Sequence, residues 1–200
     1  MINAVDMVGV ISSTTYGSRY PDCACSGTLQ IKRTNGHAVD EIPFAMRGCN
    51  PSDIEQHYGM KVHIKGHLAS VNVRDKPGKR KLLVYVEVTS LIRAAPDEED
   101  KNFVVYEGTI CKEPDKRLTK AGTIITDFIV AHNWDKPKRS FYIPCIAWDG
   151  KAELIALMSL SDKISVTGRL QSRNYLKQLN NGTVETRITY ELSTSSFTDL

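Results

Sequence analysis

The chain of 200 residues contains one sequence pattern twice, about 100 positions apart. Residues 62–70, Val-Lys-Ile-Lys-Gly-His-Leu-Ala-Ser, return as residues 164–172, Ile-Ser-Val-Thr-Gly-Arg-Leu-Gln-Ser, and Gly9 returns as Gly108. Solenoid repeats are shorter, roughly 20–50 residues, whereas a period near 100 is the size of a small domain. The sequence therefore predicts one domain duplicated in tandem.

The predicted boundary between the copies is the acidic segment 94–101, Ala-Ala-Pro-Asp-Glu-Glu-Asp-Lys. It joins a proline to four consecutive acids and lacks a hydrophobic period, which is typical of a solvated connector. The predicted domains are residues 1–93, with net charge +4, and residues 102–200, with net charge +2. Both domains are weakly basic, which permits a polyanionic partner without requiring one.

The signals inside each copy are those of strands. Residues 164–172 alternate apolar and polar side chains, the period of two that indicates a half-buried strand. Residues 83–88 and 186–192 are predicted to form the next strand of each copy. Asn181-Gly182 in the second copy and Pro77-Gly78 in the first mark the hairpin turns before them.

Each copy also contains one short helical segment between its third and fourth strands. Asn50-Pro51 supplies a cap and a proline suited to the first helical position, and residues 151–160 predict the second helix. The apolar residues expected to face the core are Ile54, Tyr58, Leu154, Leu157 and Met158. Three strands, a helix and a hairpin predict an all-β protein of two tandem OB-folds, each a five-stranded antiparallel barrel.

Composition argues against several classes of protein. No apolar run approaches the ~20 residues of a membrane span, and the first residues lack the features of a signal peptide, so a cytoplasmic location without membrane contact is expected. Five cysteines, an odd number, favour free thiols over a secreted disulfide framework. Cys23-Ala-Cys25 has one spacer residue and no second ligand pair, so neither a metal nor a cofactor is expected. No catalytic motif is present, and the chain is not expected to be an enzyme.

Three segments of the second copy carry a family resemblance. They are Phe-Ile-Val-Ala-His-Asn-Trp at 128–134, Tyr-Ile-Pro-Cys-Ile-Ala-Trp-Asp-Gly-Lys-Ala-Glu at 142–153 and Gly-Arg-Leu-Gln-Ser-Arg-Asn-Tyr at 168–175. In order and spacing, the region from 102 to about 193 resembles the bacterial single-stranded DNA-binding protein family. The resemblance implies four aromatic positions that stack on bases, which fall on Trp134, Tyr142, Trp148 and Tyr175.

Physical reasoning supports the same surface. A protein that holds any single strand needs base stacking, because every base has a π-face. Tyr142 and Trp148 lie six positions apart and so on one side of a strand, while Arg169 and Arg173 alternate with apolar positions. The predicted nucleic-acid-binding residues of this copy are Trp134, Tyr142, Trp148, Tyr175, Arg169, Arg173, Lys136, Lys138, Arg139 and Lys177.

The competing interpretation is that these aromatic side chains belong to the core, as most do in barrels of this size. Trp134 shares its parity with Phe128 and Val130, so only a bulge or the loop itself would expose it. Phe141, one position out of register with Tyr142, is expected to be a core partner.

The first copy lacks the stacking positions. Glu41 or Ile42 stands in the place of Tyr142, the place of Trp148 falls near Arg47, and that of Tyr175 falls at Val73. A basic hairpin at 74–81 remains, and OB-folds commonly bind oligonucleotides with this connection. Its candidate contacts are Arg74, Lys79, Arg80 and Lys81. A solvated turn explains these charges equally well, and assembly is another role open to this copy.

These features predict a protein that binds single-stranded DNA with little sequence preference, in DNA replication, repair or recombination. One alternative is an RNA-binding OB-fold protein, since stacking and cations do not separate RNA from DNA. Another is an OB-fold scaffold or replication-restart adaptor that mainly binds proteins. The resemblance implies four barrels per assembly, so a homodimer is favoured, with replication or repair proteins as further partners.

Overall fold

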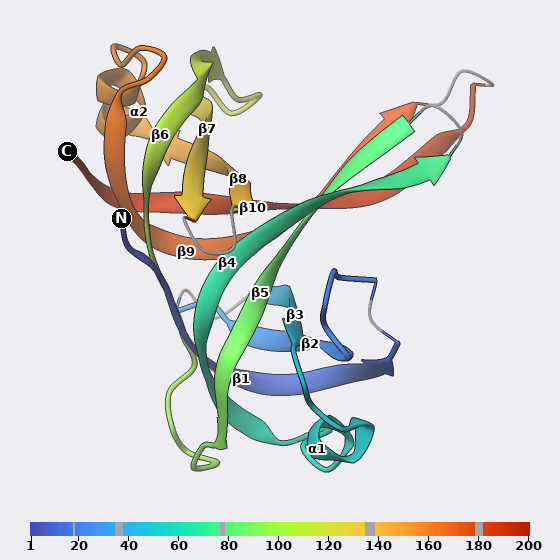
Figure 1. Cartoon of the computed structure of the whole chain (residues 1–200). Coiled ribbons are helices and arrows are strands. Elements are labelled where there is room, and N and C mark those ends of the chain that lie inside the picture. The colour runs from blue at the N-terminus through green and yellow to red at the C-terminus, as the bar shows by residue number, and fades with distance from the viewer. Residues whose placement is uncertain (18, 35–37, 77–78, 135–138, 179–181) are drawn as a thin grey trace.

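The structure is a computed structural model that describes residues 1–200 except 18, 35–37, 77–78, 135–138 and 179–181 (Figure 1). Within helices and strands, the side chains left undescribed are those of Pro51, Asp75, Lys76, Lys79, Tyr175, Leu176, Lys177 and Arg187. The first half contains β1 (Asn3–Tyr16), β2 (Cys25–Lys32), β3 (Val39–Met46), α1 (Pro51–Glu55), β4 (Lys61–Lys76) and β5 (Lys79–Arg93). The second half repeats this order with β6 (Lys101–Leu118), β7 (Ile124–Trp134), β8 (Arg139–Trp148), α2 (Asp149–Ile155), β9 (Lys163–Gln178) and β10 (Val184–Asp199).

Each half closes into a five-stranded barrel. In the first, β1 pairs with β2 and β4, β2 with β3, and β4 with β5, all antiparallel. A short parallel pairing of β3 with β5 completes the barrel, and β8 with β10 does the same in the second. The predicted pair of OB-type barrels is confirmed, with these short parallel pairs as the departure from an antiparallel arrangement.

The two barrels share one sheet, which the sequence pattern does not predict. Strands β1 and β6 pair antiparallel, from Asn3 opposite Tyr106 to Val8 opposite Lys101. The ten strands thereby form one sheet in the order β2-β3-β5-β4-β1-β6-β7-β8-β10-β9 across the described residues. The division into domains at 94–101 stays a prediction.

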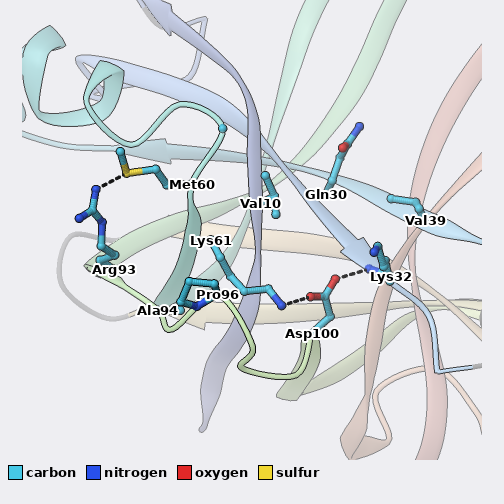
Figure 2. Close-up of a pocket in the computed structure, with 11 residues that line it drawn as sticks. Val10, Gln30, Lys32, Val39, Met60, Lys61, Arg93, Ala94, Pro96 and Asp100 are labelled. Carbon is cyan, nitrogen blue, oxygen red and sulfur yellow. Dashed lines mark hydrogen bonds and ion pairs between the residues drawn. The ribbon is translucent and has the colours of Figure 1, made fainter.

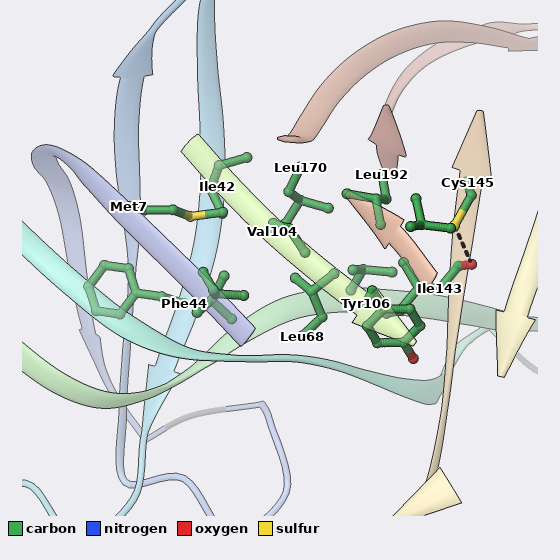
Figure 3. Packing of buried hydrophobic residues seen from close by; sticks show 14 of the residues in the cluster. Met7, Ile42, Phe44, Leu68, Val104, Tyr106, Ile143, Cys145, Leu170 and Leu192 are labelled. Carbon is green, nitrogen blue, oxygen red and sulfur yellow. Dashed lines mark hydrogen bonds between the residues drawn. The ribbon is translucent and has the colours of Figure 1, made fainter. Parts of the chain in front are cut away.

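The hydrophobic core is also continuous across this join. Figure 3 shows Met7 and Leu68 of the first barrel in one cluster with Val104, Leu170 and Leu192 of the second. All five are fully buried, and each such side chain contributes about 1.5–3 kcal/mol relative to exposure. The two halves are therefore held together by apolar packing as well as by backbone hydrogen bonds.

The repeated glycines mark sites where two backbones approach closely. A Cβ atom on Gly66 would lie 2.2 Å from the carbonyl oxygen of Glu87, and one on Gly168 would lie 2.1 Å from that of Ser193. Any side chain at either place would push the neighbouring strand away. The glycine is thus retained in both copies for the same steric reason.

An asparagine at equivalent positions in the two copies forms two hydrogen bonds with the backbone of the neighbouring strand. The Asn3 side chain donates to the Leu68 carbonyl at 2.9 Å and accepts from the Leu68 amide at 2.8 Å. Asn102 makes the same two bonds with Leu170, at 2.7 and 3.0 Å. The two copies agree in their hydrogen bonding as well as in their strand order.

The first helix begins as predicted. Asn50 is its N-cap, Pro51 lies in its first turn, and Asn50 and Asp53 form a reciprocal capping box. Ile54 is buried as expected, but Tyr58 is 62% exposed. Tyr58 lies three residues beyond the end of α1, so helical spacing no longer sets the direction of its side chain.

The predicted core face of the second helix is wrong. Helix α2 begins at Asp149 and ends at Ile155, and its buried residues are Ala152 and Ile155. Leu154 is 57% exposed and Leu157 is 81% exposed, while Met158 packs partly against the core. The helix is shorter than predicted, so Leu157 lies beyond its end, and the face that packs inward is the one with Ala152 and Ile155 instead of Leu154.

Two of the cysteines are paired. Cys25 on β2 forms a disulfide with Cys49, which precedes α1, whereas Cys23, Cys111 and Cys145 are free. The expectation of free thiols is therefore wrong for this pair, because an odd cysteine count excludes only complete pairing. Cys23 and Cys145 are buried, and burial raises the pKa of the Cys23 thiol to about 11.

The acidic connector is attached to the first barrel. The Asp100 carboxylate accepts from the Lys32 amide at 2.7 Å and pairs with the Lys61 ammonium at 2.8 Å (Figure 2). These groups line a pocket of about 670 Å³, which also includes Arg93 and Met60. Because Asp100 bonds to the Lys32 backbone and to the Lys61 side chain, this end of the predicted connector is anchored instead of solvated. Neither described helix is long and apolar enough to cross a membrane.

Candidate nucleic-acid interface

Trp134 lies at the end of β7, where the alternation of buried and exposed residues breaks. Ala131 and His132 are both buried, and Trp134 is 36% exposed. Among the described residues, the rings of His67, His132 and Phe141 contact the indole at centroid distances of 4.4, 6.0 and 6.0 Å and angles of 67°, 79° and 87°. These nearly perpendicular contacts hold the indole without stacking on it.

Two of the three aromatic residues of β8, Phe141 and Tyr142, contact the first barrel. Tyr142 is 43% exposed, and its backbone amide donates to Ser70 Oγ on β4 at 2.8 Å. Phe141 is buried as predicted, but it packs with Tyr85 and other residues of the first barrel. Trp148 is half-buried, and its Nε1 donates to Ser193 Oγ at 3.3 Å.

The predicted arginines have acidic partners. Arg173 pairs with Glu191 on β10 at 3.3 Å, within its own barrel. Arg139 pairs with Asp22, and Arg169 pairs with the buried Asp40 at 3.0 Å, both across the boundary. Burial and the charge of Arg33 lower the pKa of Arg169, against the attraction of Asp40. Arg139 and Arg169 therefore join the barrels, whatever else they bind.

Several predicted residues cannot be placed in this surface. Lys136 and Lys138 lie outside the described residues. Tyr175 and Lys177 on β9 and Lys79 on β5 have described backbones only.

The basic hairpin of the first barrel is described in part. Arg74 and Arg80 are exposed and opposite one another on the β4–β5 hairpin, and Lys81 is half-buried. Figure 1 shows this hairpin and the β9–β10 hairpin extending to the same side of the molecule, and β5 contacts β10.

The barrels meet with approximate two-fold symmetry. Ser70 and Ser172 are equivalent in the repeat, and each accepts a backbone hydrogen bond from the other barrel. Tyr142 donates to Ser70 at 2.8 Å, and Glu41 donates to Ser172 at 3.2 Å. This exchange resembles the interface of a two-fold homodimer. It also shows that Glu41, and not Ile42, occupies the place of Tyr142.

The sequence pattern did not single out a polar cluster beside Trp134. Glu87 on β5 is buried and accepts from Arg47 Nη2 at 3.2 Å, with His67 Nε2 at 3.7 Å and Arg139 Nη1 at 4.0 Å. Burial acts to raise the Glu87 pKa, but hydrogen bonds from His67 and Arg47 outweigh it and hold that pKa at about 2. The repeat offered one signal, because Arg47 occupies the place of Trp148.

Barrels of this kind with exposed aromatic side chains and cations define a class of OB-fold nucleic-acid-binding proteins. Residues 101–197 match the single-strand binding protein family. The match covers the C-terminal half of the chain, and the resemblance seen in the sequence is confirmed there.

Curated relatives cover the same region. Single-stranded DNA-binding protein 2 of Listeria monocytogenes is 34% identical over 80 residues, which are 37% of this chain and 50% of that protein. Single-stranded DNA-binding protein A of Bacillus subtilis is 32% identical over 83 residues, which are 38% and 48% of the two chains. The chain spans about half the length of these relatives.

Solved structures match the whole chain. The wild-type single-stranded DNA-binding protein from Thermus aquaticus superposes with a TM-score of 0.74 at 18% identity, covering 100% of this chain and 93% of that one. A deletion variant of the same protein gives 0.75 at 17% identity, covering 100% and 94%. At this identity the likeness shows the fold, including the tandem arrangement of barrels.

Proposed function

We propose that the chain binds single-stranded DNA with little sequence preference and acts in DNA replication, repair or recombination. The observation that carries the proposal is the pair of partly exposed aromatic side chains, Trp134 and Tyr142, within a surface that also presents arginines. Each base stacked on such a ring contributes about 1–3 kcal/mol regardless of sequence. The family and the relatives are named for binding, which agrees with the expectation that the chain is not an enzyme.

The binding surface in this proposal includes both barrels. Trp134 and Tyr142 lie beside β4 of the first barrel, and the basic hairpin around Arg80 extends on the same side as the β9–β10 hairpin. The first barrel, although it lacks stacking positions, thus contributes contacts or support. Tyr175 is assigned to the surface by the resemblance and by its strand parity with Arg173, and Lys177 is assigned because it follows Tyr175.

The test is a fluorescence titration of the full chain with a dT oligomer. In this proposal, DNA quenches Trp fluorescence, and Trp148→Phe leaves a signal that reports Trp134 alone. Matched rU and duplex DNA oligomers run in parallel. Equal or tighter binding of rU would favour the RNA-binding alternative. Binding of no oligomer at low salt would favour a scaffold that binds proteins.

Assembly and partners form the finer part of the proposal. A homodimer would bring four barrels together, and replication or repair proteins would bind to it. Light scattering of the purified chain checks the first point, because a homodimer has twice the 22.3 kDa mass of the chain. A cytoplasmic location is part of the same proposal.

A further inference from the structure

Two guanidinium groups from different barrels converge on one exposed carboxylate. Asp22, in the connection between β1 and β2, pairs with Arg139 at the start of β8 and lies 3.8 Å from Nη1 of Arg47, just after β3. The Asp22 side chain is 60% exposed, whereas Arg139 is 26% and Arg47 41% exposed. The carboxylate is therefore the member of the three that solvent and ligands reach most easily.

Arg47 is held in place independently of Asp22, by a buried carboxylate that Arg139 also faces. Arg47 donates through Nε and Nη2 to the buried carboxylate of Glu87, and Nη1 of Arg139 lies 4.0 Å from the same group. An anchored guanidinium pair is a ready anion site, since its planar donors match the oxygens of carboxylates and phosphates. The site lies beside the indole, because Arg139 pairs directly with Trp134 across β7 and β8.

Asp22 itself has an unusual backbone. Its φ of 58° lies in the left-handed region, which is uncommon for residues other than glycine, asparagine and aspartate. An exposed residue in this conformation with a carboxylate between two arginines of separate barrels has no role in the core. The Asp22 carboxylate lies between Arg47 and Arg139, and Arg139 is the strand partner of Trp134.

We infer that Asp22 is an internal substitute for a nucleic-acid phosphate: Arg47 and Arg139 form a phosphodiester site, and a bound single strand displaces the Asp22 carboxylate from it. This inference rests on the proposed function and adds Arg47, from the first barrel, to the binding surface. It also gives that residue a role parallel to the one predicted for Trp148, its equivalent in the second barrel.

The test is Asp22→Asn in the full chain, since asparagine tolerates the same φ and removes the competing charge. The dissociation constant for a dT oligomer is measured by fluorescence titration at several salt concentrations. We expect binding about two- to fivefold tighter at low salt, the range of an exposed ion pair. The slope of log affinity against log salt steepens by up to about 0.7, because one more counterion is released.

Asp97→Asn, on the exposed connector, changes net charge equally and serves as the control. Arg47→Ala weakens binding, and Asp22→Asn in an Arg47→Ala background gives a smaller gain than in the wild type. If the wild type binds dT but Asp22→Asn matches Asp97→Asn, or binds more weakly, the inference is overturned while the proposed function survives. If the wild type binds no dT, the proposed function fails instead.

Discussion

The two sides of the barrel boundary use the same backbone arrangement for different chemistry. On one side, Arg33, the buried Asp40 and Arg169 form an ionic cluster. On the other, the equivalent positions carry Trp134, Phe141 and His67, which form ring contacts. In the ionic cluster, both guanidinium groups pair with the one buried carboxylate of Asp40. The aromatic cluster instead leaves the indole of Trp134 partly exposed, and a base can stack on such a ring.

The largest expected effect is on the ionic side. Asp40→Ala leaves Arg33 and Arg169 without their shared carboxylate and removes the acceptor for the Ser172 amide. Breaking a buried charge cluster costs about 3–4 kcal/mol, so urea unfolding should show a loss of this size. Glu41→Ala, at the exposed neighbouring position, should change stability by less than about 0.5 kcal/mol. Equal losses of unfolding free energy in the two variants would show that the buried Asp40 carboxylate stabilises the boundary no more than the exposed Glu41 does.

On the aromatic side, Glu87 makes stability depend on pH. Its folded pKa of about 2 lies below the ordinary 4.5, so its contribution is complete above pH 4.5 and is lost as the pH falls through about 2. Relative to Glu87→Gln, the wild type should lose about 2–3 kcal/mol of unfolding free energy over that interval. Chemical unfolding at each pH measures this difference. A constant difference from pH 5 to pH 2 would show that the carboxylate is not stabilised by His67 and Arg47.

DNA binding should separate the two sides most directly. Trp134→Ala should weaken dT binding by about 1–3 kcal/mol with the fold intact, because one stacking ring is removed. Arg33→Ala, at the equivalent place, should have a much smaller effect, since Arg33 pairs with the buried Asp40. Anisotropy titrations at fixed salt compare the two. If Arg33→Ala proved the more damaging, the binding surface would lie on the ionic side.

The smallest effect concerns the basic hairpin of the first barrel. Replacing Lys79, Arg80 and Lys81 with Ala should reduce the salt slope by about 0.7 for each phosphate that the hairpin no longer neutralises. The weakening should be similar for dT, dC and mixed sequences, because phosphates carry no base identity. A triple variant with the wild-type slope would identify the hairpin as a solvated turn. A change of oligomeric state would instead assign it to assembly.

Local patterns predicted most of the fold. The alternation from Ile164 to Leu170 and the repeated glycines place strands correctly, because burial on one face and close backbone contact act within a few residues. The β1–β6 join and the Cys25–Cys49 disulfide escaped prediction. Each depends on which distant segment becomes a neighbour, and the sequence pattern does not contain that information.

The candidate site was also predicted only in part, because strand parity gives the face of a side chain but not its partners. Strand parity correctly indicates that Arg169 faces away from its own core, but Asp40, which pairs with it, lies 129 positions earlier. Parity also placed Trp134 inward, and the end of β7 exposes it. A strand pattern therefore predicts on which face a side chain lies, whereas the element that covers this face follows only from the tertiary arrangement.

The reciprocal bonds of Ser70 and Ser172 describe a dimer-like interface within one polypeptide. In a homodimer of identical chains, one gene encodes both sides, so every substitution at the interface occurs twice. Here each side is encoded separately, and a residue can change on one side while its equivalent stays as it was. Joining the barrels in one chain thus allows His67 and Arg169, at equivalent positions, to hold a ring on one side and a carboxylate on the other.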